Sequence, residues 1–133
     1  MAMKKFFVGV KAVIREERGI LLIKHASGFW DMPGGRLDDD ETLEEGLTRE
    51  ISEELPGSKL KSIKNQISTY RVHKDIVDDV SLVLVLFDVD VELAEKVVFS
   101  DEHTEYRWIQ RPEDKPEPID PNMWKIVSNS LKW

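Results

Sequence analysis

The chain has 133 residues, no cysteine and a formal net charge of −7 at pH 7. This length suits one domain with its own hydrophobic core, so we expect residues 1–133 to form a single domain. The absence of cysteine excludes disulfide scaffolds, thiolate metal sites and cysteine nucleophiles. The acidic balance argues against nucleic acid as a partner, because nucleic-acid-binding proteins usually present a basic face.

No leader-type cleavage site follows the opening residues. The longest apolar run, around residues 83–87, is too short for a membrane span. We therefore expect a cytoplasmic protein that does not contact membranes. If its ligand is anionic, a divalent cation is the simplest counter-ion for an acidic protein.

The first third of the chain has the patterns of short strands. Apolar residues alternate along 6–15, which predicts a strand with one buried face. A turn at 16–19 leads into the apolar run 20–23, which we expect to pair back as a hairpin. A further short strand over 29–32 ends at Pro33-Gly34-Gly35.

The clearest predicted helix spans residues 42–55. Thr42 followed by Glu45 is a capping-box pattern, in which each side chain satisfies a free backbone N–H of the other residue. An apolar residue at every fourth position predicts one buried stripe, formed by Leu43, Leu47, Ile51 and Leu55. Pro56 ends the helix, because proline disfavours helical geometry in the residue before it.

Three more strands are expected over residues 63–72, 80–91 and 106–109. The run from 80 to 87 is nearly all apolar, which predicts a central strand buried on both faces. A proline-rich loop over 113–121 precedes a closing helix over 122–133. Two helices with about five to seven strands predict an α+β fold in which helices cover a mixed sheet.

Three glutamates of the predicted helix lie in one sector. Glu50, Glu53 and Glu54 are spaced i, i+3 and i+4, and like charges at these spacings destabilise a helix. They also lie in the C-terminal half, where the helix dipole disfavours anions. A solvated acidic face is the more frequent meaning of such a cluster. The alternative is a metal site, for which carboxylate oxygens select Mg²⁺ or Mn²⁺.

Nearby residues favour the metal site. Gly34 and Gly35 allow the backbone to approach an ion or a phosphate closely. Gly46 lies one turn before Glu50, where a missing side chain leaves room for a ligand. Arg49 has a planar fork that orients a carboxylate or holds a phosphate oxygen.

These residues resemble the Nudix box of the Nudix hydrolases, G-x5-E-x7-R-E-U-x-E-E-x-G-U, where U is a bulky apolar residue. The matching positions are Gly35, Glu41, Arg49-Glu50-Ile51 and Glu53-Glu54, with the family's spacing throughout. The approach from Trp30 to Gly34 and the acidic loop over 100–108 are also similar to the family. One departure is Pro56, which stands in place of the family's glycine, with Gly57 where an apolar residue is expected.

The resemblance implies a Nudix α/β/α sandwich that hydrolyses a nucleoside diphosphate linked to another moiety. It implies Mg²⁺, with Mn²⁺ as a substitute, and activated water as the attacking group. By the same resemblance, the metal ligands are Glu50, Glu53, Glu54 and the carbonyl of Gly34 or Gly35. Arg49, which also serves catalysis and phosphate binding, supports the site together with Glu41 and Gly46. A small-molecule nucleotide is the implied partner, and a homodimer is consistent with the family.

Several roles stay open at this point. The general base is Glu53, Glu102 or Glu105, and our hypothesis is that Glu102 completes the site. His103 is either catalytic or a surface-loop residue without a role, and His25 and His73 have no motif around them. The candidates for stacking on a substrate base are Phe29, Trp30, Tyr70 and Trp108, although isolated aromatic residues in strands are more often part of the core.

Two other functional classes remain alternatives. One is a non-catalytic nucleotide-binding or regulatory module of the same fold. The other is an isomerase-like protein that acts on a diphosphate without hydrolysing it. The substrate also remains open among nucleoside triphosphates, dinucleoside polyphosphates, nucleotide sugars and ADP-ribose. Lys59, Lys61 and Lys64 form a modest basic patch that we interpret as a solvated strand edge.

Overall fold

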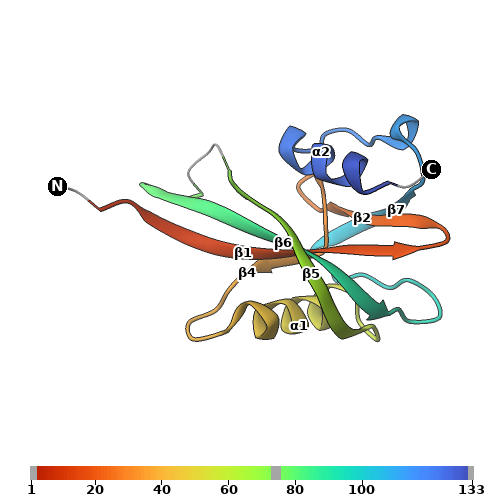
Figure 1. Cartoon of the computed structure of the whole chain (residues 1–133), viewed down its shortest axis with the longest axis horizontal. Coiled ribbons are helices and arrows are strands. Elements are labelled where there is room, and N and C mark those ends of the chain that lie inside the picture. Colours follow the sequence, from red (N-terminus) through yellow and green to blue (C-terminus); the bar gives the residue numbers. More distant parts are fainter. Residues whose placement is uncertain (1–2, 73–75, 132–133) are drawn as a thin grey trace.

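The frame of the molecule is a mixed sheet with one helix on each face (Figure 1). The computed structural model describes residues 3–72 and 76–131. In chain order the elements are β1 (Lys5–Glu16), β2 (Gly19–His25), β3 (Trp30–Asp31), β4 (Gly34–Arg36), α1 (Leu43–Glu54), β5 (Lys59–Arg71), β6 (Val80–Glu92), β7 (His103–Ile109), a short 3₁₀ helix (Pro112–Asp114) and α2 (Pro121–Ser130). The expected α+β fold, with two helices on a mixed sheet, is confirmed.

The strand order is β3-β2-β1-β6-β5, with β4 also pairing with β1 and β7 with β2. β1 and β6 run parallel along nearly their whole length, from the pair Lys5–Val80 to the pair Ile14–Val89. The other pairs of named strands are antiparallel. The predicted hairpin between the first two strands is confirmed by the pairing of Arg15 with Ile20.

β1 lies at the centre of this sheet, and residues 9–14 are all buried. The expectation of a single buried face was therefore wrong. Alternation along a strand marks one buried face only when the other face meets solvent, whereas both faces of β1 are covered. Val10 packs in the core beneath α1, and Val13 packs in the core beneath α2. The prediction for β6 holds, because its residues 84–87 are buried within the sheet.

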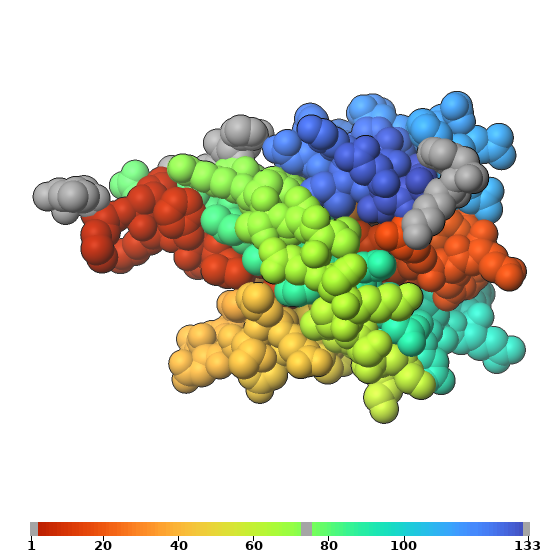
Figure 2. Space-filling view, viewed as in Figure 1, coloured from red at the N-terminus to blue at the C-terminus, as the bar shows by residue number. Residues whose placement is uncertain are grey.

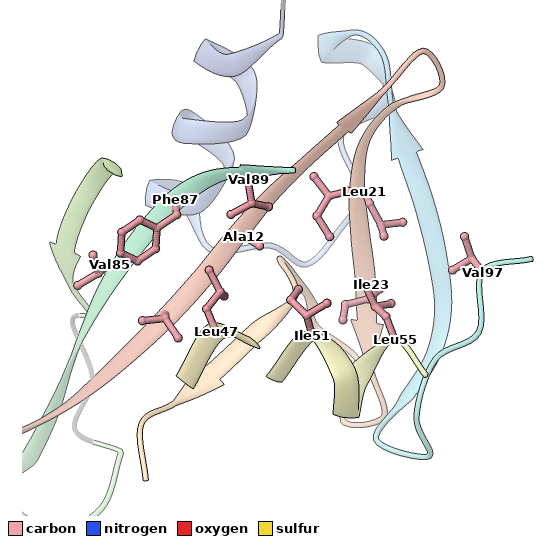
Figure 3. Packing of buried hydrophobic residues seen from close by; sticks show 12 residues of the cluster. Ala12, Leu21, Ile23, Leu47, Ile51, Leu55, Val85, Phe87, Val89 and Val97 are labelled. Atoms are coloured by element: carbon pink, nitrogen blue, oxygen red, sulfur yellow. The ribbon is translucent and has the colours of Figure 1, made fainter. Parts of the chain in front are cut away.

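α1 begins as the sequence predicts. Both halves of the capping box between Thr42 and Glu45 are present. Leu47, Ile51 and Leu55 are fully buried and pack against the sheet (Figure 3), whereas Leu43 is 36% exposed. The helix ends at Glu54, with Leu55 as its C-cap.

The departure from the family pattern at 56–57 forms a tight turn after this helix. The N–H of Leu55 still bonds to the carbonyl of Ile51 at 2.9 Å, and the N–H of Ser58 bonds to the carbonyl of Leu55 at 2.9 Å. Gly57 has a φ of +83°, a conformation that glycine adopts without strain. Pro56 and Gly57 therefore redirect the chain after the helix and leave its hydrogen bonds intact up to Leu55.

α2 covers the opposite face of the sheet, as the space-filling view also shows (Figure 2). It begins at Pro121, one residue before the predicted start, because proline suits the first helical position. Met123 and Val127 are buried against the sheet. The helix ends at Ser130, and the predicted residues 132–133 lie outside the described part. Among the described residues, neither helix is both long and apolar enough to cross a membrane.

Candidate active site

A cleft of about 540 Å³ opens beside the N-terminal end of β4 and the glutamate-bearing face of α1. The predicted site residues Gly34, Gly35, Glu50, Glu54 and Glu102 line this cleft. These residues come from β4, from α1 and from the loop before β7, so the sheet brings together segments that are far apart in the sequence.

Glu54 is the most deeply placed of the helix glutamates, with 7% of its surface exposed. The backbone N–H of Gly34 donates to its Oε1 at 2.6 Å. Its Oε2 lies 3.5 Å from Nε2 of His103, which is itself 6% exposed. Burial raises the pKa of Glu54 to about 8, against the opposing effects of Lys11 and the Gly34 N–H. With a pKa of about 8 this carboxyl group binds a proton at neutral pH, and a cation beside it would favour its charged form.

Lys11 and Asp31 form a buried ion pair at the floor of the same cleft. The ammonium of Lys11 lies 2.8 Å from Oδ2 of Asp31, and their side chains are 10% and 19% exposed. It also donates to the carbonyl oxygens of Met32 and Gly34, each at 3.4 Å. Burial alone would lower the pKa of Lys11, but the carboxylates of Asp31 and Glu54 outweigh it and raise the pKa. Lys11 is therefore a permanent positive charge among these acids.

Glu50 faces β4 at close range. A Cβ added to Gly35 would lie 2.6 Å from the Glu50 carboxyl carbon, so only glycine leaves this carboxylate its present place. Burial raises the pKa of Glu50, and its contact with Arg49 opposes this shift. Gly34 has a φ of +141°, and a Cβ there would collide with the backbone of β1. Each glycine of the pair thus meets a separate steric demand.

Arg49 connects the box residues outside the cleft floor. Its guanidinium donates to both oxygens of Glu41, at 2.7 and 3.0 Å, and to Glu50 at 2.8 Å. It also reaches Glu53 at 3.2 Å and the carbonyl of Arg36 at 3.0 Å. The hydrogen bond from Arg49 and a second one from a backbone N–H lower the pKa of Glu41 to about 2. Arg49 therefore joins the loop before α1 to two of the three helix glutamates.

The space beside Gly46 is occupied. A Cβ at this position would collide with the side chain of Leu37 and would lie 3.4 Å from Oε1 of Glu41. The glycine therefore lets the loop pack against α1, rather than leaving room for a ligand.

Several candidates lie away from the cleft floor. Glu53 does not line the cleft, and its side chain is 60% exposed. Glu105 pairs with Lys24 at 3.3 Å on the exposed side of β7. Trp30 is 4% exposed and belongs to the core beneath α2, which disfavours stacking on a substrate. The surface-loop interpretation of His103 was wrong, because its ring is buried against Glu54. His73 lies outside the described residues.

The donor set fits a hard divalent cation in its chemistry. Glu50 and Glu54 supply carboxylate oxygens to one cleft, and the Gly34–Gly35 backbone adjoins them. Within residues 3–72 and 76–131, however, no three acidic or histidine side chains already converge as a ligand group. Two of the three helix glutamates, Glu50 and Glu53, instead accept hydrogen bonds from Arg49.

Lys11 and Asp31 are the site residues that sequence reasoning missed. In the sequence, Lys11 is a polar residue within an otherwise apolar strand pattern. The signal that points to it is its place between Val10 and Ala12 in a strand buried on both faces, because a lysine there requires a partner. Asp31, immediately before Met32-Pro33-Gly34, carries no comparable signal by itself.

A mixed sheet between two helices, with a glutamate helix facing a glycine strand across a cleft, defines the Nudix class of fold. The chain belongs to the NUDIX domain family, which matches residues 5–129. The Nudix hydrolase expected from the box alone is thereby confirmed at the level of the family.

Individual relatives agree with this assignment. The chain is 33% identical over 60 residues to an 8-oxo-dGTP diphosphatase of Proteus vulgaris, a match that covers 41% of this chain and only 54% of that protein. It is 28% identical over 112 residues to the nucleoside triphosphatase NudI of Enterobacter sp. (strain 638), covering 74% and 78% of the two chains. The crystal structure of a MutT NUDIX hydrolase from Burkholderia pseudomallei superposes with a TM-score of 0.77 at 28% identity, covering 97% and 100%.

Proposed function

We propose that the protein hydrolyses a pyrophosphate bond in a nucleoside diphosphate linked to another moiety, and that it requires Mg²⁺. The observation that carries this proposal is the buried Glu54 carboxylate, which Gly34 holds in the cleft beside Glu50. Membership of the NUDIX family supports the reaction class. The names of the relatives, a diphosphatase and a nucleoside triphosphatase, support a nucleotide as the substrate.

Each residue has a distinct part in this proposal. Glu50 and Glu54 hold the cation, with a carbonyl of the Gly34–Gly35 strand as a further oxygen donor. A bound Mg²⁺ supplies positive charge to the diphosphate and lowers the pKa of a water molecule. Arg49 orients Glu50 through the 2.8 Å hydrogen bond. Glu53, which accepts a hydrogen bond from Arg49 at 3.2 Å, would be a further carboxylate ligand.

The positions of the three candidates support Glu102 as the general base. Of the three candidates, Glu102 lines the cleft, whereas Glu53 and Glu105 do not. In the proposal Glu102 accepts the proton of the attacking water, since a base must come within hydrogen-bond reach of the proton it removes. Glu102→Gln is expected to lower kcat, because the amide cannot accept the proton. Unchanged turnover and metal dependence in this variant would exclude the role.

The main experiment is a coupled phosphate-release assay with and without Mg²⁺, on a panel of nucleoside triphosphates, dinucleoside polyphosphates, nucleotide sugars and ADP-ribose. Inorganic pyrophosphatase converts pyrophosphate from the triphosphates to phosphate, and for the other substrates alkaline phosphatase, added after the reaction is stopped, releases phosphate from the newly formed phosphate monoesters. Glu54→Gln is expected to lower kcat by several orders of magnitude. Glu44→Gln is the matched control, because Glu44 is an exposed residue in the first turn of the same helix. Near-normal activity of the Glu54 variant refutes the assignment.

The same assay separates the alternatives. A wild-type protein that binds a nucleotide in the presence of Mg²⁺ but releases no phosphate fits the non-catalytic module. The observation that favours this alternative is the lack of a converged ligand group among the described residues. A product with the substrate's own mass would instead indicate an isomerase-like reaction.

A further inference from the structure

Two chemically different groups of side chains line the cleft. One group consists of the acids and Lys11, and the other consists of the aromatic rings of His25 and Phe29. Phe29 is 43% exposed, so part of its ring is accessible to a ligand. The proposed reaction assigns no task to either ring.

The two rings form a parallel stack. Their centroids are 4.8 Å apart and their planes differ by 9°. The ring of His103 meets His25 edge-on, with centroids 5.7 Å apart and planes at 84°. The His25 ring therefore contacts one face of the Phe29 ring and is itself in contact with the buried His103. Phe29 remains 43% exposed.

The turn that carries Phe29 is closed by hydrogen bonds. The N–H of His25 donates to the carbonyl of Phe29 at 2.8 Å, and the N–H of Gly28 donates to the carbonyl of His25 at 2.8 Å. The N–H of Ser27 donates to Nδ1 of His25 at 3.0 Å, which fixes the imidazole ring. Gly28 has a φ of +106°, which a residue with a side chain adopts only with strain. The stacked rings of His25 and Phe29, which we call the aromatic platform, are thus held in place without a ligand.

We propose that the exposed face of Phe29, backed by His25, stacks on the base of the nucleotide whose phosphates lie beside the Glu50 and Glu54 side chains of the same cleft. This inference rests on the proposed function and adds the part of the site that recognises the base. A ring face in the same cleft as the acids suits a ligand with a planar group at one end and phosphates at the other. Stacking tolerates any base, so the platform selects nucleotides over phosphates without a base.

The other aromatic candidates are less suited to this task. Trp30 is buried in the core, with the guanidinium of Arg107 placed 4.9 Å from its ring centroid. Trp108 has the guanidinium of Arg18 at 4.4 Å from its ring centroid. Neither ring lines the cleft. Phe29 combines exposure, aromatic support and a place at the cleft wall.

The test compares two ligands that differ only in the base. The affinities of guanosine 5′-monophosphate and of ribose 5-phosphate are measured by calorimetric titration of the full chain, with Mg²⁺ present. Phe29→Ala is expected to weaken binding of the nucleotide about tenfold and to change that of the sugar phosphate less than twofold. Phe29→Leu is expected to behave like the alanine variant, and Phe29→Trp to retain the affinity.

The control variant is Phe6→Ala. Phe6 has the same exposed fraction of 43% but lies on β1 and does not line the cleft. It is expected to leave the affinities for both ligands unchanged. In the wild type, nuclear Overhauser effects between H8 of the guanine and the ring protons of Phe29 are expected as direct evidence of the stack.

Two results would overturn the proposal. One is unchanged nucleotide affinity in Phe29→Ala, and the other is equal weakening of both ligands. The failure of the proposed function is distinguishable from either result, because it is read as an absence of Mg²⁺-dependent phosphate release from wild-type protein. Binding of guanosine 5′-monophosphate is measured without any turnover.

Discussion

Replacing Lys11 with methionine tests whether the ion pair at the cleft floor behaves as a buried pair. The substitution keeps a side chain of similar length but leaves the Asp31 carboxylate without its cation. Oδ1 of Asp31 already lacks a hydrogen-bond partner, so the remaining carboxylate oxygen would join it. Breaking a buried pair by removing one partner costs about 3–5 kcal/mol. Because the Asp31 side chain is 19% exposed, we expect the lower end, about 3 kcal/mol.

The assay is a double-mutant cycle on the free energy of unfolding. Lys11→Met, Asp31→Asn and the double variant are unfolded in urea and followed by tryptophan fluorescence at pH 7. The expected coupling energy is about 2 kcal/mol or more, within the range for directly contacting residues. Since the pKa of Lys11 lies above its ordinary value of 10.5, the stabilisation is lost only as the pH rises through that higher pKa.

A matched cycle on Lys24 and Glu105 provides the comparison. This pair has the same chemistry and an N–O distance of 3.3 Å, but the side chains are 32% and 55% exposed. Its coupling is expected to stay below about 1 kcal/mol, as for surface pairs. If the Lys11–Asp31 coupling is no larger than this, burial does not strengthen the pair and our reasoning about the cleft floor fails.

Three further predictions concern the glycine strand and the box. Arg49 holds the pKa of Glu41 at about 2, so wild-type protein loses stability as Glu41 is protonated between about pH 4.5 and pH 2. Glu41→Gln is expected to lose less stability over this range than the wild type. An acid-unfolding profile identical to that of the wild type would contradict this. Gly35→Ala is expected to weaken Mg²⁺ binding by about 10–100-fold, because the new Cβ displaces the flexible Glu50 carboxylate. Its melting temperature is expected to stay nearly unchanged. Titration calorimetry measures the Mg²⁺ affinity and scanning calorimetry measures the melting temperature. Gly34→Ala is instead expected to destabilise the fold by about 2 kcal/mol or more, because its φ of +141° is strained for alanine and its Cβ meets the backbone of β1; a normal urea midpoint would disprove it.

The elements that the sequence predicts well are those specified by neighbouring residues. The capping box and the four-residue apolar spacing place α1 within one residue at each end, because both signals lie inside the helix itself. The same spacing predicts the positions of Glu50 and Glu54 in one sector. Both do line one cleft.

The parts that the sequence does not predict depend on contacts between distant segments. Lys11 and Asp31 are 20 positions apart, and their pairing follows from the packing of β1 beside the residues that precede β4. The burial of His103 likewise follows from the approach of β7 to α1, which no local pattern encodes. Leu43 has the right spacing for the apolar stripe but is the first residue of α1 and stays 36% exposed.

The bulges of β5 have a consequence for how the molecule meets its neighbours. β5 is a strand of 13 residues at the end of the sheet order, and its pairing with β6 shifts register at three places. Each shift interrupts the regular spacing of backbone donors and acceptors along the free edge. Lys59, Lys61 and Lys64 add positive charge along the same strand. An incoming strand therefore finds neither a continuous hydrogen-bonding edge nor an apolar one, which protects the sheet against edge-to-edge aggregation.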